Sequence, residues 1–380
     1  MKLAMTPVKR NGFASVSFDY IRFIAALAVV LGHAVTRFFG PYSDVIDPSL
    51  SEKVFRVVFS GYGAQAVMVF FVLSGLFIGQ SVLSQLQRDK FAFRQYALRR
   101  LIRLWLVLIP ALFLTYVVDS FGITYLSHDL IYQASGMFGS VNPEDLSFPV
   151  FLSNAFFLQT IVNPTYGSNG ALWSLANEFW YYIVFPLIAI PLFCARARYI
   201  KVLMISAAAA LLVFVGFRIS VLFVVWLLGV ALLFIPKSAN PRVSWKWLLG
   251  VSSVVFFFIL LFIRLSGQME SKLLEEMLCG TGFFLFCYSL IYCDNYINAS
   301  EKHQSVSFEL AGFSYSLYLI HTPLLCLARG WIVGGDGYLT FDMRTALIFF
   351  TVIAVIVVLS YGLAKVTEFH THKVYKKLGI

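Results

Sequence analysis

Long apolar runs, separated by short polar breaks, recur along the whole chain. Each run approaches the roughly 20 residues that an α-helix needs to cross a bilayer, and the runs are continuously apolar rather than alternating, which argues against a membrane β-barrel. The pattern predicts an all-α polytopic membrane protein of about ten transmembrane helices. The predicted spans are 18–39, 62–83, 104–118 (short as drawn, with a start near Tyr96), 171–193, 202–217, 219–235, 247–263, 277–293, 308–328 and 345–366.

Composition points to the same class of protein. The chain is 59% hydrophobic and 13% charged, whereas a soluble domain is nearer half apolar and a quarter charged. So much apolar surface cannot be buried in one water-soluble core, and the bilayer has to act as its solvent. The net charge of +10 then reflects basic residues kept on cytoplasmic loops rather than a nucleic-acid partner.

The distribution of basic residues predicts the orientation. With the N-terminus in the cytoplasm, 20 of the 29 Lys and Arg residues lie on the inner side and 8 on the outer side, and segment 119–170 has none. This asymmetry predicts ten spans with both termini cytoplasmic. The expected organisation is a tail 1–17, a ten-helix domain 18–366 with 119–170 as a large extracytoplasmic loop, and a tail 367–380. Within that loop, the apolar piece 148–158 predicts a re-entrant or interfacial helix.

Two ionisable residues lie inside the first span. Arg22 and His33 are separated by 11 positions, which on an α-helix is about 20° past three full turns and about 16.5 Å of rise. Both side chains therefore fall on one face. Arg22 could simply snorkel to the cytoplasmic interface, and His33 could pack against a neighbouring helix. A shared stripe of costly polar groups instead favours a functional pair.

Glu178 and His321 are the other ionisable groups at a similar depth. Glu178 lies about two turns inside the fourth span, deeper than an interfacial aromatic belt, and needs a partner such as His33. His321 lies in the outer half of the ninth span. Structural pairing and ordinary packing are the alternatives for these two residues.

Three arginines gather at the inner end of the third span. Arg99 and Arg103 are four positions apart and share a helix face, which Arg100 flanks. Guanidinium groups bind phosphate bidentately, so the group would suit a phosphate-rich ligand. Anchoring by the positive-inside rule is the equal alternative.

Other common sites are not indicated. The five cysteines lie in or beside apolar runs without metal-like spacing, so neither a disulfide framework nor a metal site is expected. His370 and His372 alone make a poor metal site. We find no glycine-rich phosphate loop and no nucleophile elbow.

The intramembrane motifs together resemble those of the integral-membrane acyltransferase-3 family. FDYIRFIAALAVVLGHAV resembles the family's Asp-x-x-Arg and Arg-x10-His signature, through Asp19, Arg22 and His33. RRLIRLW resembles its Arg-Arg-x-x-Arg element, and WSLANEFWYYIVFP its Trp-Ser-Leu-x-x-Glu stretch. SYSLYLIHTPLL resembles a late helix of the family, and GYGAQAVMVFFVLSGLFIG its second helix. Tyr20 and Phe23 stand where many members have Gly.

The resemblance implies a membrane O-acyltransferase of the bacterial cytoplasmic (inner) membrane, in a stand-alone form without a fused esterase-like domain. It would move an acyl group, commonly acetyl, from cytoplasmic acyl-CoA to a hydroxyl of a surface polysaccharide, lipopolysaccharide or lipid-linked saccharide. Acetyl-CoA would be a co-substrate, no cofactor would be bound, and glycan-assembly proteins would be partners. The expected roles are catalysis by His33, Glu178 and Arg22, donor binding by Arg99, Arg100 and Arg103, and acceptor binding by Asp19, Trp173, Asn177 and His321.

The alternative from a different class is a secondary transporter or flippase for a saccharide or another small polar solute. Such a protein would also place charges inside a ten-helix bundle. Transporters usually show related halves and paired Gly/Pro-broken helices at the substrate site, and this sequence shows neither.

Overall fold

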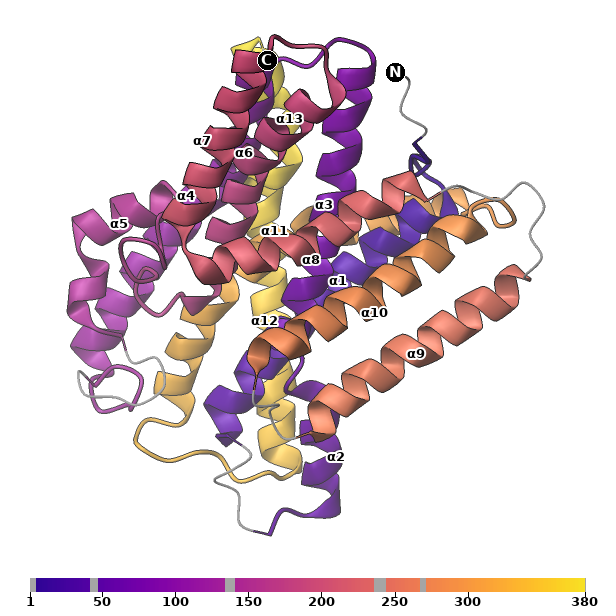
Figure 1. The fold of residues 1–380 in the computed structure, drawn as a ribbon. Coiled ribbons are helices and arrows are strands. Elements are labelled where there is room, and N and C mark those ends of the chain that lie inside the picture. Colours follow the sequence, from indigo (N-terminus) through magenta and orange to yellow (C-terminus); the bar gives the residue numbers. More distant parts are fainter. Residues whose placement is uncertain (1–4, 42–46, 134–140, 236–243, 267–270, 380) are drawn as a thin grey trace. The chain divides into compact units, whose positions relative to one another are not determined.

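The computed structural model describes residues 5–41, 47–133, 141–235, 244–266 and 271–379, which are largely helical (Figure 1). Within these ranges the only extended pairing is one isolated bridge between Gln159 and Asn163, so the all-α prediction is confirmed. The elements are α1 (Phe13–Phe39), α2 (Leu50–Phe59), α3 (Gly63–Gln87), α4 (Phe93–Tyr125), η2 (Pro143–Leu146), α5 (Phe148–Ala155), η3 (Gly170–Leu172), α6 (Trp173–Phe193), α7 (Arg198–Val215), α8 (Phe217–Ala231), η4 (Leu232–Phe234), α9 (Trp245–Leu265), α10 (Lys272–Cys293), α11 (Glu301–Ile332), α12 (Met343–Val366), η5 (Glu368–His370) and α13 (Thr371–Leu378).

Ten helical segments in the described ranges are long and apolar enough to cross a membrane, and they match the ten predicted spans one for one. The third differs most, because α4 runs over 33 residues from Phe93 to Tyr125. Its first turns carry arginines that a hydropathy pattern excludes, and its last turns enter segment 119–170. That segment also holds η2, α5 and η3, and α5 coincides with most of the predicted 148–158 helix; residues 134–140 lie outside the described part. Which side each terminus faces stays a prediction.

Helix α2 was not predicted, because its ten residues are too short and too polar to register as a span. The buried Arg56 explains why it forms. Its guanidinium forms an ion pair with the Glu52 carboxylate, one helical turn earlier, at 2.9 Å. It also donates to the Gly40 carbonyl at 2.9 Å and the Phe39 carbonyl at 2.6 Å, both at the end of α1. The four-residue spacing of Glu52 and Arg56 stabilises α2 itself. The hydrogen bonds to the two carbonyls hold α2 against the end of α1.

The chain forms two compact units, each assembled from three separate stretches. The first unit comprises 1–25, 64–100 and 177–311, and the second comprises 26–63, 101–176 and 312–380. The chain passes from one unit to the other within α1, α4 and α11, and close to the starts of α3 and α6. Each unit is described by itself below.

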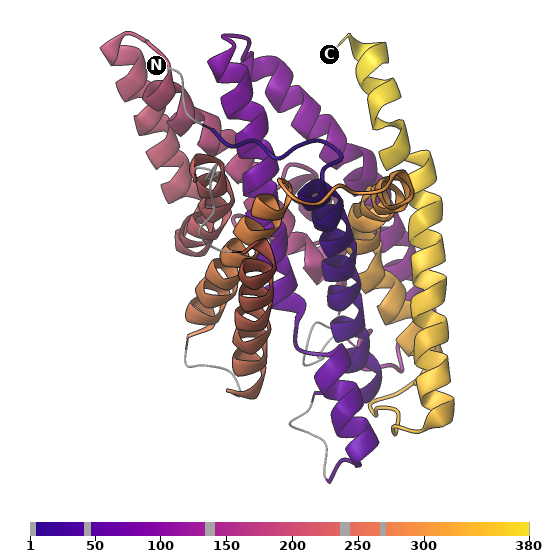
Figure 2. The ribbon, with the colours of Figure 1, turned by 90° about the vertical axis from the view of Figure 1, so that its right-hand side faces the viewer.

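Helix α3 and helix α8 pack closely in the first unit. A Cβ atom on Gly75 would collide with the Trp226 carbonyl, and one on Gly229 would collide with the Val72 carbonyl, so glycine at both positions lets the two backbones meet. Helices α9 and α10 of the same unit lie side by side (Figure 2). Gly216 adopts φ +85°, a conformation that other residues rarely take, between the end of α7 and the start of α8.

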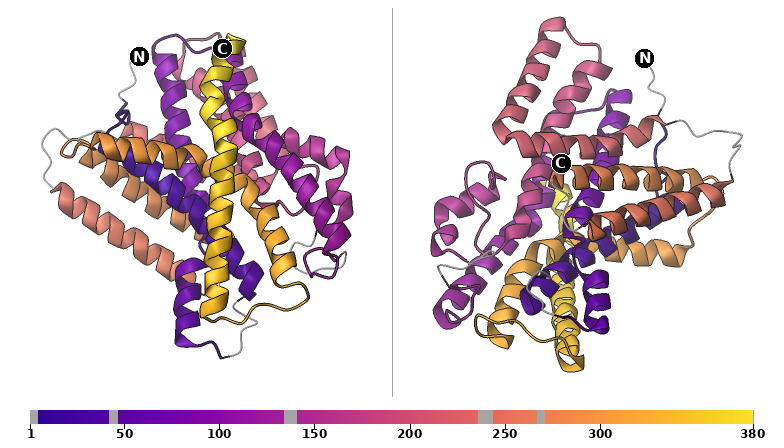
Figure 3. Two further views of the ribbon diagram at one scale, coloured as in Figure 1. Left: turned by 180° about the vertical axis from the view of Figure 1, so that it is seen from behind. Right: turned by 60° about the horizontal axis from the view of Figure 1, so that its bottom comes forward.

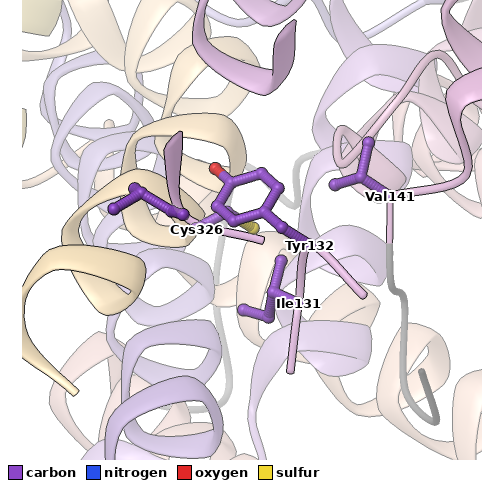
Figure 4. Close-up of a cluster of buried hydrophobic side chains, with 5 residues drawn as sticks. Ile131, Tyr132, Val141 and Cys326 are labelled. Atoms are coloured by element: carbon purple, nitrogen blue, oxygen red, sulfur yellow. The ribbon is translucent and has the colours of Figure 1, made fainter. Parts of the chain in front are cut away.

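In the second unit, the loop after α11 leads back into α12 (Figure 3, left). Beside α11 lies an apolar cluster in which Cys326 meets Ile131, Tyr132 and Val141 (Figure 4). Arg329, one helical turn further on and only 1% exposed, pairs with Asp129 and donates to the Arg37 carbonyl at 2.9 Å. This buried pair links the Asp129 segment of the unit to α11, and the hydrogen bond to the Arg37 carbonyl links α11 to α1.

Candidate active site

His33 and His321 face each other in the second unit. His33 comes from α1 and His321 from α11, and His33 Nδ1 lies 3.0 Å from His321 Nε2. The rings are stacked, with centroids 5.1 Å apart and 25° between their planes. His321 is fully buried, whereas His33 is partly exposed. The sequence placed both residues at similar depth, and the structure brings them together.

The hydrogen bonds of His321 determine which nitrogen of His33 can act as a base. His321 Nδ1 lies 2.7 Å from the carbonyl oxygen of Tyr318, and since a carbonyl only accepts, this nitrogen carries a hydrogen. In a neutral His321, Nε2 is then an acceptor. His33 Nδ1 must donate to it, which leaves His33 Nε2 with an unprotonated lone pair. The pair therefore presents the second nitrogen of His33 as a proton acceptor.

Pro323 and Asn169 help to hold His321 in place. Pro323 lies inside α11 and, having no N–H, leaves the Leu319 carbonyl without its helical partner. Asn169 donates to that carbonyl at 2.8 Å. One residue earlier, the Tyr318 hydroxyl forms a 2.7 Å hydrogen bond with the Ser174 hydroxyl. The turn that carries His321 is thereby fixed from the segment that leads into α6.

Space beside His33 depends on Gly63. A Cβ atom at position 63 would lie 4.0 Å from His33 Nε2, so a side chain there would be in van der Waals contact with the imidazole. Arg37, one turn beyond His33 on α1, donates to Cys326 Sγ at 3.3 Å. Arg37 was not predicted as a site residue, although its i+4 spacing from His33 was a usable signal.

Glu178 is the centre of a second polar cluster, in the first unit. Its Oε1 accepts from the Ser74 hydroxyl at 3.1 Å and from the Tyr182 hydroxyl. Ser74 in turn accepts from Trp226 Nε1 at 3.1 Å. The sequence analysis did not single out Ser74, since intramembrane serines usually bond to their own helix. The predicted partnership of Glu178 with His33 joins residues of different units and stays a prediction.

The remaining predicted acceptor-binding residues have separate surroundings. Asp19 and Arg22 face each other on α1 at 4.0 Å, each partly buried. Asn177 is buried and donates to the Tyr181 hydroxyl at 3.3 Å. Trp173 begins α6 and is partly exposed. Their roles stay predictions.

The three arginines of the predicted donor site lie on the first turns of α4. Arg99 and Arg103 are exposed, as their shared helix face predicts. Arg100 is partly buried, lies over the Tyr96 ring at 5.5 Å from its centroid, and lies 3.5 Å from the Ser81 hydroxyl. Arg100 is thus held in a defined position, which suits a side chain that binds phosphate. Its role in donor binding stays a prediction.

Within the described ranges, no group of three or more His, Cys, Asp or Glu side chains could hold an ion. The chemistry that the clusters offer is proton transfer at His33 and hydrogen bonding at Glu178.

The fold and these clusters define an integral membrane protein whose described part holds ten helices long and apolar enough to span a bilayer, with hydrogen-bonded acid and base groups among them. A family model described as an acyltransferase domain matches residues 15–365. The chain therefore belongs to the acyltransferase-3 family, as the motifs predicted, and is a membrane acyltransferase.

Two relatives extend this finding. An O-acetyl transferase of Shigella phage Sf6 is 25% identical over 318 residues, covering 81% of this chain and 84% of the relative. An uncharacterized protein of Haemophilus influenzae is 31% identical over 142 residues, covering 36% of this chain and 53% of that protein. No solved structure matches the chain.

Proposed function

We propose that the protein is a membrane O-acetyltransferase that moves an acetyl group from cytoplasmic acetyl-CoA to a hydroxyl of a carbohydrate. Family membership and the phage relative's name support acetyl transfer to oxygen. The resemblance of the motifs supports a surface polysaccharide, lipopolysaccharide or lipid-linked saccharide as acceptor, in the bacterial inner membrane, with glycan-assembly proteins as partners.

The observation that carries the mechanism is the hydrogen-bond chain from the Tyr318 carbonyl through His321 to His33. It holds His33 in the tautomer whose Nε2 accepts a proton. That nitrogen takes the proton of the acceptor hydroxyl while the hydroxyl oxygen attacks the thioester carbonyl. The new C–O bond forms, the C–S bond breaks, and the imidazolium returns its proton to the departing thiolate. His321 acts here as a positioning residue.

The donor is expected at the cytoplasmic end of α4, where Arg99, Arg100 and Arg103 would bind the phosphates of the coenzyme. Arg22, about three turns from His33 toward the predicted cytoplasmic end of α1, would guide the thioester inward. Glu178 would stabilise the charge that develops near the acceptor. Its two hydroxyl partners, Ser74 and Tyr182, keep the carboxylate in one orientation.

Replacing His33 tests this mechanism. In purified protein, His33→Ala should lower transfer of label from acetyl-CoA to de-O-acetylated surface polysaccharide by about 10²- to 10⁴-fold, which is what general-base catalysis supplies. The matched control His128→Ala removes an exposed imidazole of the same unit and should keep wild-type activity. Wild-type rates in His33→Ala would refute the mechanism. Counterflow of unaltered saccharide without label transfer would support the transporter alternative.

A further inference from the structure

Among the buried acceptor oxygens of the first unit for which the described residues provide no hydrogen-bond partner, three lie in the first turns of their helices. They are Gln65 Oε1, Asn177 Oδ1 and Glu276 Oε2. The three side chains are 7%, 1% and 4% exposed. Burying such a group without a partner destabilises the fold, so three of them in one unit call for a ligand that brings several donors.

Contacts within the unit link the residues that carry these oxygens. Arg218 Nη2 binds Glu276 Oε1 at 2.5 Å, and the next residue, Ile219, accepts from the Tyr181 hydroxyl at 2.6 Å. Tyr181 also contacts Asn177. On the other side, Cys279, one turn after Glu276, lies with its Sγ 3.6 Å from the Gln65 carbonyl.

The orientation of Asn177 follows from Tyr181. The Tyr181 hydroxyl donates its only hydrogen to the Ile219 carbonyl, so it can act only as an acceptor toward Asn177. The amide nitrogen must therefore face Tyr181, at 3.3 Å. The amide oxygen points elsewhere and stays available to a donor.

The cluster lies at one end of its helices. Gln65, Asn177, Arg218 and Glu276 all occur within the first turns of α3, α6, α8 and α10. These are the second, fourth, sixth and eighth spans, which start on the same side of the membrane when spans alternate in direction. The predicted orientation makes that the outer side. The Arg218 side chain is 53% exposed, so the ion pair reaches the surface of the unit.

We infer that this cluster, defined by Gln65, Asn177, Glu276 and Arg218, binds hydroxyl groups of the saccharide acceptor; the inference rests on the proposed function. A polyol supplies several O–H donors at short spacing, which matches the three unpartnered oxygens, while the guanidinium can donate to a sugar oxygen. A metal ion is disfavoured because the Glu276 carboxylate already binds the Arg218 cation. An anionic headgroup would be repelled by that carboxylate.

Kinetics with de-O-acetylated surface polysaccharide test the inference. Glu276→Gln and Gln65→Met should each raise KM for the polysaccharide about tenfold, the effect of losing one hydrogen bond of about 1.4 kcal/mol. The value of kcat and the acceptor-independent hydrolysis of acetyl-CoA should stay at wild-type levels. Glu275→Gln makes the same charge change on the neighbouring residue of α10 and should leave KM unchanged.

Direct binding separates this inference from the proposed function. Calorimetric titration of the same polysaccharide into wild-type protein should show binding that both variants weaken by the same factor. Binding without acetyl transfer would refute the proposed function and leave the subsite standing. No binding by wild type would overturn the subsite. Unchanged affinity in both variants, with a lowered unfolding temperature, would likewise show that the cluster only supports the fold.

Discussion

Proline residues inside the spanning helices leave carbonyl groups that other side chains satisfy. Pro186 in α6 removes the helical donor for the Tyr182 carbonyl, and the Tyr96 hydroxyl donates to that carbonyl at 3.1 Å. Pro323 and Asn169 make the equivalent arrangement at Leu319. At both positions a polar side chain, Tyr96 or Asn169, replaces the backbone donor that proline lacks and so stabilises the helix.

A double-mutant cycle can measure this task at Tyr96. Tyr96→Phe leaves the Tyr182 carbonyl without a donor and should destabilise the protein by about 1 kcal/mol. In a Pro186→Ala background the helix regains its own N–H donor, so the same change should have little effect. Unfolding in mixed micelles would give the two free energies. Equal losses in both backgrounds would show that the hydroxyl does not replace the proline's missing donor.

The histidine pair supports a second prediction at this scale. His321→Leu removes the acceptor for His33 Nδ1–H, so the tautomer is no longer fixed, and kcat should fall by about 10²-fold, at the lower end of the range for general-base catalysis. His321→Gln offers an amide oxygen to the same N–H and should recover part of the rate. KM for acetyl-CoA should stay constant. Equal loss in both variants would indicate that His321 does more than orient its neighbour.

At the scale of elements, the spans were predictable from sequence because helix formation in a bilayer depends on local apolar length. The polar clusters were predictable only residue by residue. An ionisable group in a span is conspicuous, but its partner is not. Ser74 and Glu178 are 104 positions apart, and Asn169 and Leu319 are 150 apart, so these pairs follow from tertiary packing that no local pattern encodes.

Helix α4 holds the three arginines that are predicted to bind the phosphates of acetyl-CoA. Guanidinium binds phosphate through a planar fork that lysine lacks, so Arg100→Lys or Arg103→Lys should keep the positive charge and the orientation while weakening donor binding. Loss of one charged hydrogen-bonding partner of roughly 1.5–3 kcal/mol corresponds to about 10- to 150-fold. Acetyl-CoA titration of each purified variant would measure this change. If both variants bind acetyl-CoA with wild-type affinity, the arginines only set the orientation of the helix in the membrane.

At the scale of the whole molecule, the orientation in the membrane rests on charge alone, since ten apolar helices cross equally well in either direction. Segment 119–170, with no basic residue, is expected outside.

Cysteine labelling tests the orientation in a variant whose five native cysteines are replaced. Glu144 and Lys376 are both exposed. A membrane-impermeant maleimide added to intact cells with a permeable outer membrane should label Glu144→Cys directly. It should reach Lys376→Cys only after the inner membrane is opened. The reverse pattern would invert the predicted topology.

The interleaving of the two units bears on how the protein is made. Neither unit is a continuous piece of sequence, and the two histidines that pair in the second unit are 288 positions apart. At about 5–20 residues per second, a ribosome synthesises the second histidine roughly 15–60 s after the first. During that interval the first helix is inserted with an unpaired imidazole. A nascent chain arrested before α11 would therefore hold a candidate base that nothing yet orients, and acetyl transfer should begin only after the ninth span has entered the membrane.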